Sequence, residues 1–462
     1  MSQKTLFTDF DYVVNLVLFY RNFFIKYIMK TGTLIAILIL SLNIFNLKAQ
    51  NPFIRTHFTS NPSPLIYNET AYIFACHDED YADKFRIYEW RLYSSKDMVN
   101  WRDHGSPLSL DDFEWAGDLA GPGQCIMHNG KFYFFASIHS KLNDSLSIGV
   151  AVADKIDGPY TDAIGKPLVT GSDPTVFVDD DGSVYLFWGK EIVSFARLND
   201  DMISFNGKIN QILPDCYTES PFLTKRNGKY HLLYAAGGYP EHIAYSTAYN
   251  IEGPYVYEGE IMSAENFRIF TNRCGVFNFK NHYYFVYHNC KLSRGNNFDR
   301  SIAIEEFSYT SDGFFPAIKQ TDKGVEAIDV FYPYALKIEA ECMSFSNGIS
   351  TERSKKDGVY VSEIHKYDYI KISNLDFGKV SPQNISVRVA SGLRGGEITF
   401  HADSLSAAPF AKFIVKNTGG WEKFKTLNSS VWGSLTGIHD IYIKFDGNRG
   451  NKICNFDFWK IF

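Results

Sequence analysis

The sequence predicts an all-β protein, in which a five-bladed β-propeller precedes a β-sandwich of jelly-roll type. Three observations support this prediction. Aromatic residues make up 16% of the 462 residues, and aromatic enrichment favours strands. A turn followed by an aromatic-rich strand recurs five times between residues 51 and 332. From residue 336 the chain changes to short apolar stretches separated by glycine turns, and neither part shows a convincing helical pattern.

Each repeat consists of a hairpin turn and the strand that follows it. Asn129-Gly130, Asp181-Gly182 and Asn227-Gly228 are dipeptides typical of tight hairpins. Each unit is therefore expected to form one small antiparallel sheet, and five sheets fit a five-bladed propeller. A β-sandwich with coincidental hairpins is the alternative. The five segments are 67–74, 128–135, 181–187, 227–234 and 280–287.

Residues 1–50 differ from the rest of the chain. Met29 and Lys30 precede an apolar run over residues 33–47, which is typical of an export signal. The run is shorter than the roughly 20 residues of a membrane span. We expect Met29 to be the true start and the protein to be periplasmic or extracellular; a single uncleaved N-terminal anchor is the alternative.

The remaining sequence divides into a propeller at 51–332 and a sandwich at 333–462. The 46 basic and 52 acidic side chains give a net charge of −6. This balance argues against a nucleic-acid partner, and no protein partner is predicted. The seven cysteines form no CxxC pair, so a zinc site is not expected. The sequence does not decide whether Cys342 and Cys454 form a disulfide.

A polar residue directly precedes four of the expected inner strands. Three of these residues lie in turns that contain proline, and the fourth lies in the turn Asn-Arg-Cys-Gly. They are Asn61, Asp173, Glu219 and Arg273. Because the inner strands of a propeller line its central channel, these side chains are expected to converge there. An Asp and a Glu facing one cavity are the groups that a glycosidase needs. The alternative for each residue alone is a simple turn.

The stretch from Asn51 to about Phe315 resembles glycoside hydrolase family 43, five-bladed enzymes acting on xylan, arabinoxylan and arabinan. The resemblance implies an inverting hydrolase of plant-type hemicellulose, of the β-xylosidase, α-L-arabinofuranosidase or xylanase type. Its partner would be a xylan-type or arabinoxylan-type polysaccharide or oligosaccharide, and its chemistry would need no cofactor. The segments that carry the resemblance are 51–55, 77–80, 90–95, 173–177, 179–182, 240–246 and 287–289.

The same resemblance implies roles for particular residues. The general acid falls on Glu219. The aspartate that tunes the acid's pKa and orients the substrate falls on Asp173. The arginine that contacts the substrate falls on Arg300. The general base of the family falls on Asn61, and an amide is not a useful base at neutral pH.

Two further positions depart from the family pattern. The central histidine of the family, often a calcium ligand, falls on Arg273, and an expected tryptophan is missing from 116–124. These departures predict either an impaired hydrolase or a catalytically inactive homologue that still binds carbohydrate. Three residues are candidate substitute bases, although a rim or loop position is the simpler interpretation: His77, Asp78 and Asp118.

The C-terminal part resembles a family 6 carbohydrate-binding module. Such modules hold a sugar between two aromatic rings and fix it with an asparagine, roles that fall on Tyr360, Trp421 and Asn455. Aromatic rings suit this task because one face of a sugar is apolar. A purely structural core position is the alternative for Trp421.

A structural calcium ion is also implied by the resemblance to this module. Its ligands would be Glu339, Glu341 and Asp457. Carboxylate oxygens are the ligands that calcium prefers. The choice of glycan, the exo or endo action and the oligomeric state are not predicted by the sequence.

Overall fold

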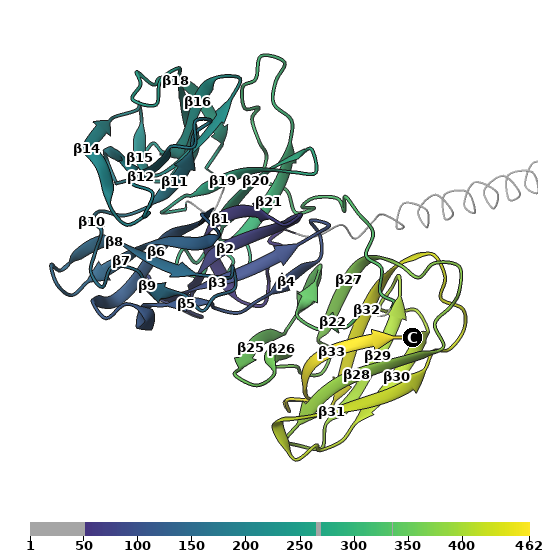
Figure 1. The fold of residues 1–462 in the computed structure, drawn as a ribbon. Coiled ribbons are helices and arrows are strands. Elements are labelled where there is room, and N and C mark those ends of the chain that lie inside the picture. The colour runs from purple at the N-terminus through teal and green to yellow at the C-terminus, as the bar shows by residue number, and fades with distance from the viewer. Residues whose placement is uncertain (1–50, 265–268, 335) are drawn as a thin grey trace, which may run out of the picture. The chain divides into compact units, whose positions relative to one another are not determined.

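Figure 1 shows a computed structural model that describes residues 51–264, 269–334 and 336–462. The predicted export signal with its start at Met29 lies outside the described residues. In the described ranges the regular structure is strand, apart from one 3-10 turn, η1 (Leu110–Asp112). No helix in these ranges is long and apolar enough to cross a membrane. The all-β prediction is confirmed.

Five antiparallel sheets follow one another along the propeller, in chain order (Figure 1). The first contains β1 (Phe58–Tyr67), β2 (Thr70–Asp78), β3 (Ile87–Ser95), β4 (Trp101–Asp103) and β5 (Leu108–Ser109). The second contains β6 (Ala116–His128), β7 (Lys131–Ser140), β8 (Ser145–Ala153), β9 (Thr161–Asp162) and β10 (Val169–Thr170). The third contains β11 (Thr175–Val178), β12 (Val184–Trp188), β13 (Val193–Leu198) and β14 (Phe205–Ile212).

The last two sheets complete the propeller. The fourth contains β15 (Tyr217–Arg226), β16 (Lys229–Ala236), β17 (His242–Ala248) and β18 (Val256–Met262). The fifth contains β19 (Cys274–Phe279), β20 (His282–Asn289) and β21 (Ser301–Phe307). Each of the five predicted hairpins joins the first two strands of one sheet.

The five sheets close into a ring. Their first strands contact one another in the order β1, β6, β11, β15 and β19, and β19 returns to β1. Apolar clusters fill all five spaces between neighbouring blades. The alternative of a sandwich for this part of the chain is therefore wrong.

The second strand of each blade supplies the packing on both of its sides. Successive side chains of a strand point to opposite faces, so two adjacent apolar residues reach two different clusters. Burying one such side chain contributes about 1.5–3 kcal/mol, and this alternation holds every blade to both neighbours. The five pairs are Ile73 and Phe74, Phe134 and Phe135, Leu186 and Phe187, Leu232 and Leu233, and Phe285 and Val286.

Where the first and fifth blades meet, the side-chain amide of Asn51 makes hydrogen bonds to the backbone of β21, as a neighbouring strand would. The amide of Asn51 donates to the Ile304 carbonyl at 2.8 Å and accepts from the Ile304 N–H at 3.0 Å. Thr59 N–H also donates to the Arg300 carbonyl at 2.8 Å. These bonds satisfy backbone groups just before β21 and in its middle.

The C-terminal part is a sandwich of two antiparallel sheets, as predicted. One has the order β25-β26-β33-β28-β31 with β22 beside β33, and the other has the order β24-β27-β32-β29-β30. The short β23 (Cys342–Met343) pairs instead with β4 of the propeller. The remaining strands are β22 (Ile338–Glu339), β24 (Phe345–Asn347), β25 (Ser350–Ser354), β26 (Gly358–Ser362), β27 (Tyr369–Asp376), β28 (Asn384–Ser391), β29 (Gly396–Ala402), β30 (Pro409–Val415), β31 (Gly420–Ser430), β32 (Ile438–Gly447) and β33 (Asn455–Ile461).

One apolar core lies between these two sheets. Phe400 and Trp459 meet edge to face within it, with ring centroids 5.5 Å apart. Cys454 belongs to this core, whereas Cys342 lies on β23. All seven cysteines are free thiols, so the disulfide left open between Cys342 and Cys454 is not formed.

Candidate active site

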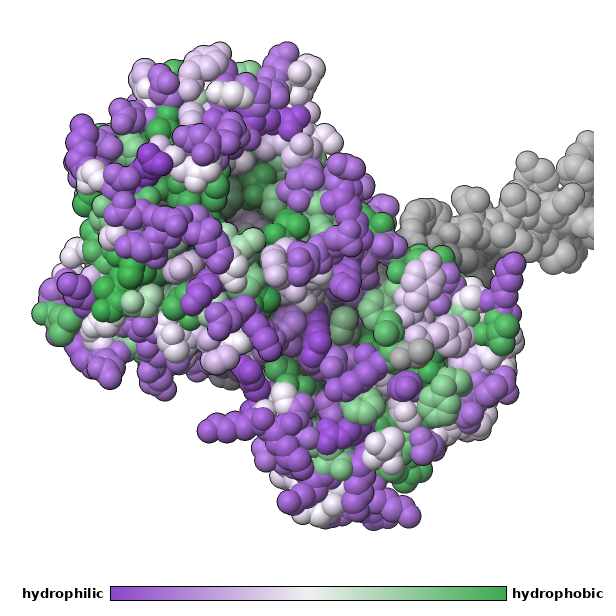
Figure 2. All heavy atoms as spheres, viewed as in Figure 1, coloured by the Kyte–Doolittle hydropathy of each residue, from purple (hydrophilic) through white to green (hydrophobic). Residues whose placement is uncertain are grey.

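A cavity of about 100 Å³ lies in the propeller. Figure 2 shows the propeller face hollowed near its centre. Every blade contributes to the cavity wall, through its strands or the loops between them. One residue from each blade illustrates this: Asn61, Gly121, Asp173, Glu219 and Arg300. The cavity therefore brings together side chains that lie far apart in the sequence.

The same backbone conformation appears at two of these positions and at Ser220, which follows Glu219. Asn61, Asp173 and Ser220 have φ angles of 53°, 60° and 58°, in the left-handed region, and each precedes a proline. Residues other than glycine rarely adopt this conformation. The pairing of β1 and of β15 with their neighbours is interrupted beside Asn61 and Ser220. Such bulges re-aim side chains, which accounts for the polar-Pro pattern in the sequence.

Asp173 is held in place by three hydroxyl groups. Ser172 Oγ donates to its Oδ2 at 2.7 Å and Ser220 Oγ donates to its Oδ1 at 3.0 Å. Its backbone N–H donates to Ser137 Oγ at 2.8 Å. Asp173 is therefore a fixed carboxylate on the cavity wall.

Glu219 lies on the same wall and is almost buried. Burial raises the pKa of its carboxyl group, and the negative charge of Asp173 raises it further. Lys190 opposes these effects, because its Nζ lies 2.5 Å from Glu219 Oε2. A carboxyl group with a raised pKa, placed beside a second carboxylate, has the environment of a general acid.

Glu241 is a further acidic group behind this wall. Burial raises the pKa of Glu241 to about 9, and the charge of Glu219 adds to the effect. Its Oε2 has no hydrogen-bond partner in the described part of the chain. Glu241 is consequently protonated and neutral at pH 7.

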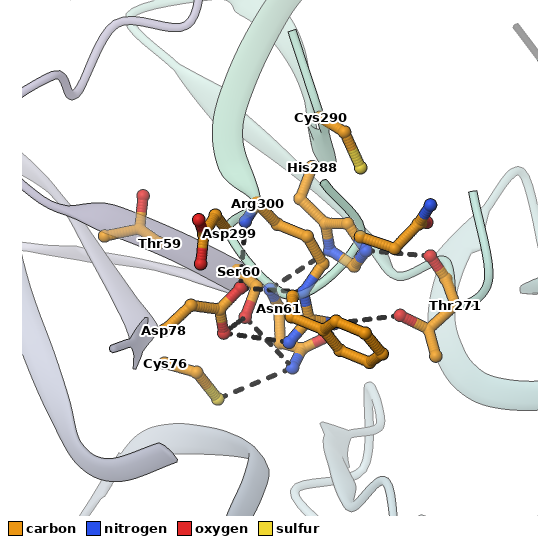
Figure 3. A network of polar contacts seen from close by, with 12 residues as sticks. Thr59, Ser60, Asn61, Cys76, Asp78, Thr271, His288, Cys290, Asp299 and Arg300 are labelled. Carbon is orange, nitrogen blue, oxygen red and sulfur yellow. Dashed lines mark hydrogen bonds and ion pairs between the residues drawn. The ribbon is translucent and has the colours of Figure 1, made fainter. Parts of the chain in front are cut away.

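Asn61 faces the cavity, and its backbone is fixed by a neutral histidine (Figure 3). Its N–H donates to His288 Nδ1 at 3.1 Å, and His288 Nε2 donates to the Thr271 carbonyl at 2.9 Å. Burial, with help from the charge of Arg300, lowers the pKa of His288 to about 3. The Asn61 amide nitrogen lies 3.5 Å from Ser60 Oγ and from Cys76 Sγ.

Arg300 reaches the cavity from the fifth blade and is clamped by Asp78. Its Nε and Nη2 donate to the two carboxylate oxygens of Asp78 at 2.8 and 2.9 Å. Nη1 donates to Thr271 Oγ1 at 2.8 Å, and Ser60 Oγ donates to Asp78 at 2.7 Å. Figure 3 shows Asp78, Arg300 and Asn61 in one network.

The three candidate substitute bases do not line the cavity. Asp78 is occupied by Arg300, as described above. His77 Nδ1 lies 2.9 Å from Glu89 Oε1, and Asp118 is a solvent-exposed partner of His139. In the cavity wall, the carboxyl groups are therefore those of Asp173 and Glu219.

Arg273 is buried and spans to the third blade. Its Nη2 donates to the Pro174 carbonyl at 2.8 Å and to Thr175 Oγ1 at 3.2 Å. Its Nε and Nη1 have no hydrogen-bond partner in the described ranges. Burial lowers the pKa of Arg273, and the nearby charge of Asp173 opposes that change.

The predicted sugar-binding residues of the sandwich have different environments. Asn455 Nδ2 donates to the Trp421 carbonyl at 2.8 Å, so these two residues are neighbours. Trp421 is half-buried outside the core cluster, and Lys452 Nζ lies 5.1 Å from its ring. Tyr360 is only 2% exposed, because its ring packs against Phe424. In this conformation Tyr360 offers no free face for a sugar to stack on.

The predicted calcium ligands are mostly occupied by cations. Arg102 contacts both Glu339 and Glu341, and Arg388 contacts Asp457. Two buried oxygens, Glu341 Oε2 and Asp457 Oδ1, have no partner in the described residues. No group of three or more His, Cys, Asp or Glu in those residues is arranged to hold a metal ion. These two oxygens could serve as calcium ligands, but they are fewer than the roughly six to eight oxygens that calcium takes.

Comparison with known proteins identifies the family. The model of glycosyl hydrolases family 43 matches residues 49–315. This chain belongs to glycosyl hydrolase family 43. The model of carbohydrate binding module (family 6) matches residues 339–462. Both resemblances inferred from the sequence are therefore confirmed, and the cavity lies within the family 43 domain.

Relatives cover most of this family 43 chain. An arabinoxylan arabinofuranohydrolase from Bacillus subtilis (strain 168) is 31% identical, over 89% of this chain and 92% of its own length. A xylosidase/arabinosidase from Bacteroides ovatus is 26% identical, over 58% of this chain and 96% of its own. A crystal structure of a Bacillus subtilis arabinoxylan arabinofuranohydrolase in complex with cellotetraose has a TM-score of 0.79 and 29% identity, over 90% of this chain and 98% of the other.

The sequence pattern located Asn61, Asp173, Glu219 and Arg300, which the structure brings to one cavity. It missed Lys190 as a neighbour of Glu219. It also assigned no role to Glu241, although this residue belongs to the matching segment 240–246. Glu241 lies in the loop between Pro240 and β17, where an acidic residue gives only a weak signal. No local signal exists for Lys190, because its contact with Glu219 joins two different blades.

Proposed function

We propose that this family 43 chain is an inverting glycosidase that removes arabinofuranosyl branches from arabinoxylan. The observation that carries the proposal is the meeting of Asp173, Glu219 and Arg300 at one cavity. The names of the related arabinofuranohydrolases support the choice of substrate. The attached family 6 module supports a polymeric rather than a free monosaccharide substrate.

In this proposal Glu219 gives its proton to the glycosidic oxygen that leaves. Asp173 keeps the pKa of Glu219 high and, with Arg300, orients the sugar. Water must attack the opposite face of the sugar ring. Asn61 stands where the family has its base, and its amide can orient this water but cannot take its proton. The loss of general-base catalysis lowers the rate by about 10²–10⁴-fold.

An aromatic row supports binding of a longer chain. Phe85 lines the cavity and meets Phe298 edge to face at 5.0 Å. Phe298 contacts Phe270 at 5.8 Å, and Phe270 contacts Tyr239 at 5.4 Å. Phe270 and Tyr239 are 42% and 60% exposed. Exposed rings that continue from a cavity offer stacking positions for sugar units beyond the cleaved bond.

The test is hydrolysis by wild type, Glu219→Gln and Asn61→Asp, with arabinoxylan oligosaccharides and aryl glycosides as substrates. We expect slow release of arabinose by wild type, none by Glu219→Gln, and a rate increase of about 10²-fold or more in Asn61→Asp. The anomer of the first product, followed by NMR, reports inversion. Equal rates in wild type and Glu219→Gln would contradict the proposal.

A catalytically inactive carbohydrate-binding homologue is the second candidate, and Asn61 is the observation that favours it. In that case wild type releases no sugar from any substrate, yet binds arabinoxylan oligosaccharides in calorimetry. The Asn61→Asp variant separates the two cases, since activity created from nothing identifies a protein that has lost only its base.

A further inference from the structure

Lys190 forms an ion pair with Glu219 at the cavity wall. It follows β12 in the third blade, whereas Glu219 lies on β15 in the fourth, and both line the cavity. The ammonium group lies 2.5 Å from Glu219 Oε2. The Lys190 side chain is 50% exposed and that of Glu219 only 8%. The lysine is therefore the mobile partner, because it alone has room to move.

The charges around Glu219 determine how strongly the contact with Lys190 affects its pKa. Asp173 faces it with a negative charge, and Arg300 and Lys190 face it with positive charges. Glu241 and Tyr217 also lie within electrostatic range, but both have raised pKa values and are neutral at pH 7. Arg273 faces Asp173 on the other side. Only Lys190 touches the Glu219 carboxylate directly among these cations.

We propose that Lys190 is a positioning residue that holds Glu219 as a carboxylate in the empty cavity and releases it when a sugar oxygen binds. Glu219 then takes up a proton from solvent only when the substrate is in place. The inference rests on the proposed role of Glu219 as the acid.

The physical argument follows from desolvation. A nearby ammonium group stabilises an ionised carboxyl group, and burial destabilises it. A sugar that displaces Lys190 removes the first effect and, by excluding water, strengthens the second. Both changes favour the protonated form of Glu219. The charge of the neighbouring Asp173 also favours the proton on Glu219.

Proton uptake on binding is the direct test. Calorimetry in buffers with different ionisation enthalpies measures the protons that are taken up when a branched xylotriose binds. An Asn61→Ala background keeps the sugar intact. We expect uptake approaching about one proton per sugar at a pH where Glu219 is ionised in the free protein. Adding Lys190→Met should reduce this uptake by at least about half, whereas Lys190→Arg, which keeps the charge, should retain it.

A second readout is the pH profile of the active protein, with Asn61→Asp as the parent. The alkaline limb of kcat/KM reports the free enzyme, and that of kcat reports the substrate complex. Lys190→Met should move the first limb to higher pH and leave the second in place. A merely structural role for Lys190 would move neither limb.

The outcomes separate the two proposals. Binding with equal proton uptake in Lys190→Met and in its parent overturns this inference alone. If protons are taken up on binding but no variant hydrolyses the substrate, the role of Lys190 is supported and the proposed glycosidase activity is ruled out. Absence of any sugar binding by the folded protein overturns both. Glu219→Gln, which cannot take up a proton, must show none in the same assay.

Discussion

Asp78 and Arg300 form an ion pair in which both side chains are almost fully buried, at 1% and 2% exposed. Taking charges out of water is costly, and the pair repays that cost only while both partners are present. Arg300 also lines the cavity, so its position depends on a residue that does not touch the substrate. Stability and sugar binding are therefore coupled at this pair.

We expect Asp78→Asn to lower the free energy of unfolding by about 3 kcal/mol, because the Arg300 charge is left buried without its partner. Chemical denaturation measures the change. Asp83→Asn is the matched control, since Asp83 pairs with Arg86 at the surface, at 2.8 Å. Such a pair is worth less than about 1 kcal/mol. Equal effects of the two substitutions would contradict the expectation.

Residues ahead of a proline were predictable from the sequence, and contacts between blades were not. Asn61 and Asp173 stand in short polar turns whose positions repeat from blade to blade, which made them visible. Lys190 meets Glu219 only because two sheets pack side by side. The packing of Tyr360 on Phe424 was equally unpredictable, although its residue type suits a sugar platform.

At the scale of single elements, β19 of the fifth blade approaches β1 of the first blade closely at Gly275. A Cβ added to Gly275 would lie 2.5 Å from Pro64 Cδ and 2.9 Å from Pro64 Cγ. Both distances are shorter than van der Waals contact. Gly275 is therefore needed because it lacks a side chain, and its neighbour on β1 is a rigid ring.

We expect Gly275→Ala to destabilise the propeller by about 2 kcal/mol through overpacking. Pro64→Ala removes the ring atoms that clash, so Gly275→Ala should cost less in that background. A double-mutant cycle in urea measures this coupling. If Gly275→Ala costs the same in both backgrounds, the contact with Pro64 does not restrict position 275.

Hairpins were the most predictable elements. All five predicted turns join strands as expected, and three of them contain the Asn-Gly or Asp-Gly dipeptide, which adopts the backbone that tight turns require. The short outer strands, such as β9 and β10, carry no such signal. The pairing of β23 with β4 was equally invisible, since it depends on how two segments about 240 residues apart in sequence come together.

For the whole molecule, the propeller and the sandwich were predictable because each has its own repeated or alternating pattern. The ring itself follows from the paired apolar residues of the second strands, which give every blade two packing faces. Occupancy by metal depends instead on oxygen atoms from distant strands, which no local pattern describes.

We propose that a calcium ion displaces Arg102 and Arg388 from Glu339, Glu341 and Asp457, and we expect Ca²⁺ to raise the unfolding midpoint of the protein relative to EDTA. A ligand at 100 times its Kd stabilises by about 2.7 kcal/mol. Burial raises the pKa of Glu341, so the effect should weaken at lower pH, where protons compete for the carboxylate. Asp457→Asn should abolish the difference; an identical midpoint in Ca²⁺ and EDTA would contradict the proposal.

The bonds of Asn51 to Ile304 have a consequence for biosynthesis. Asn51, at the start of the described propeller, can bond Ile304 only after the fifth blade has been synthesised. The ring of sheets cannot close before then. Until then a nascent chain carries four blades with open apolar flanks and an incomplete catalytic pocket. This four-blade stage is the point at which a chaperone would have most to protect.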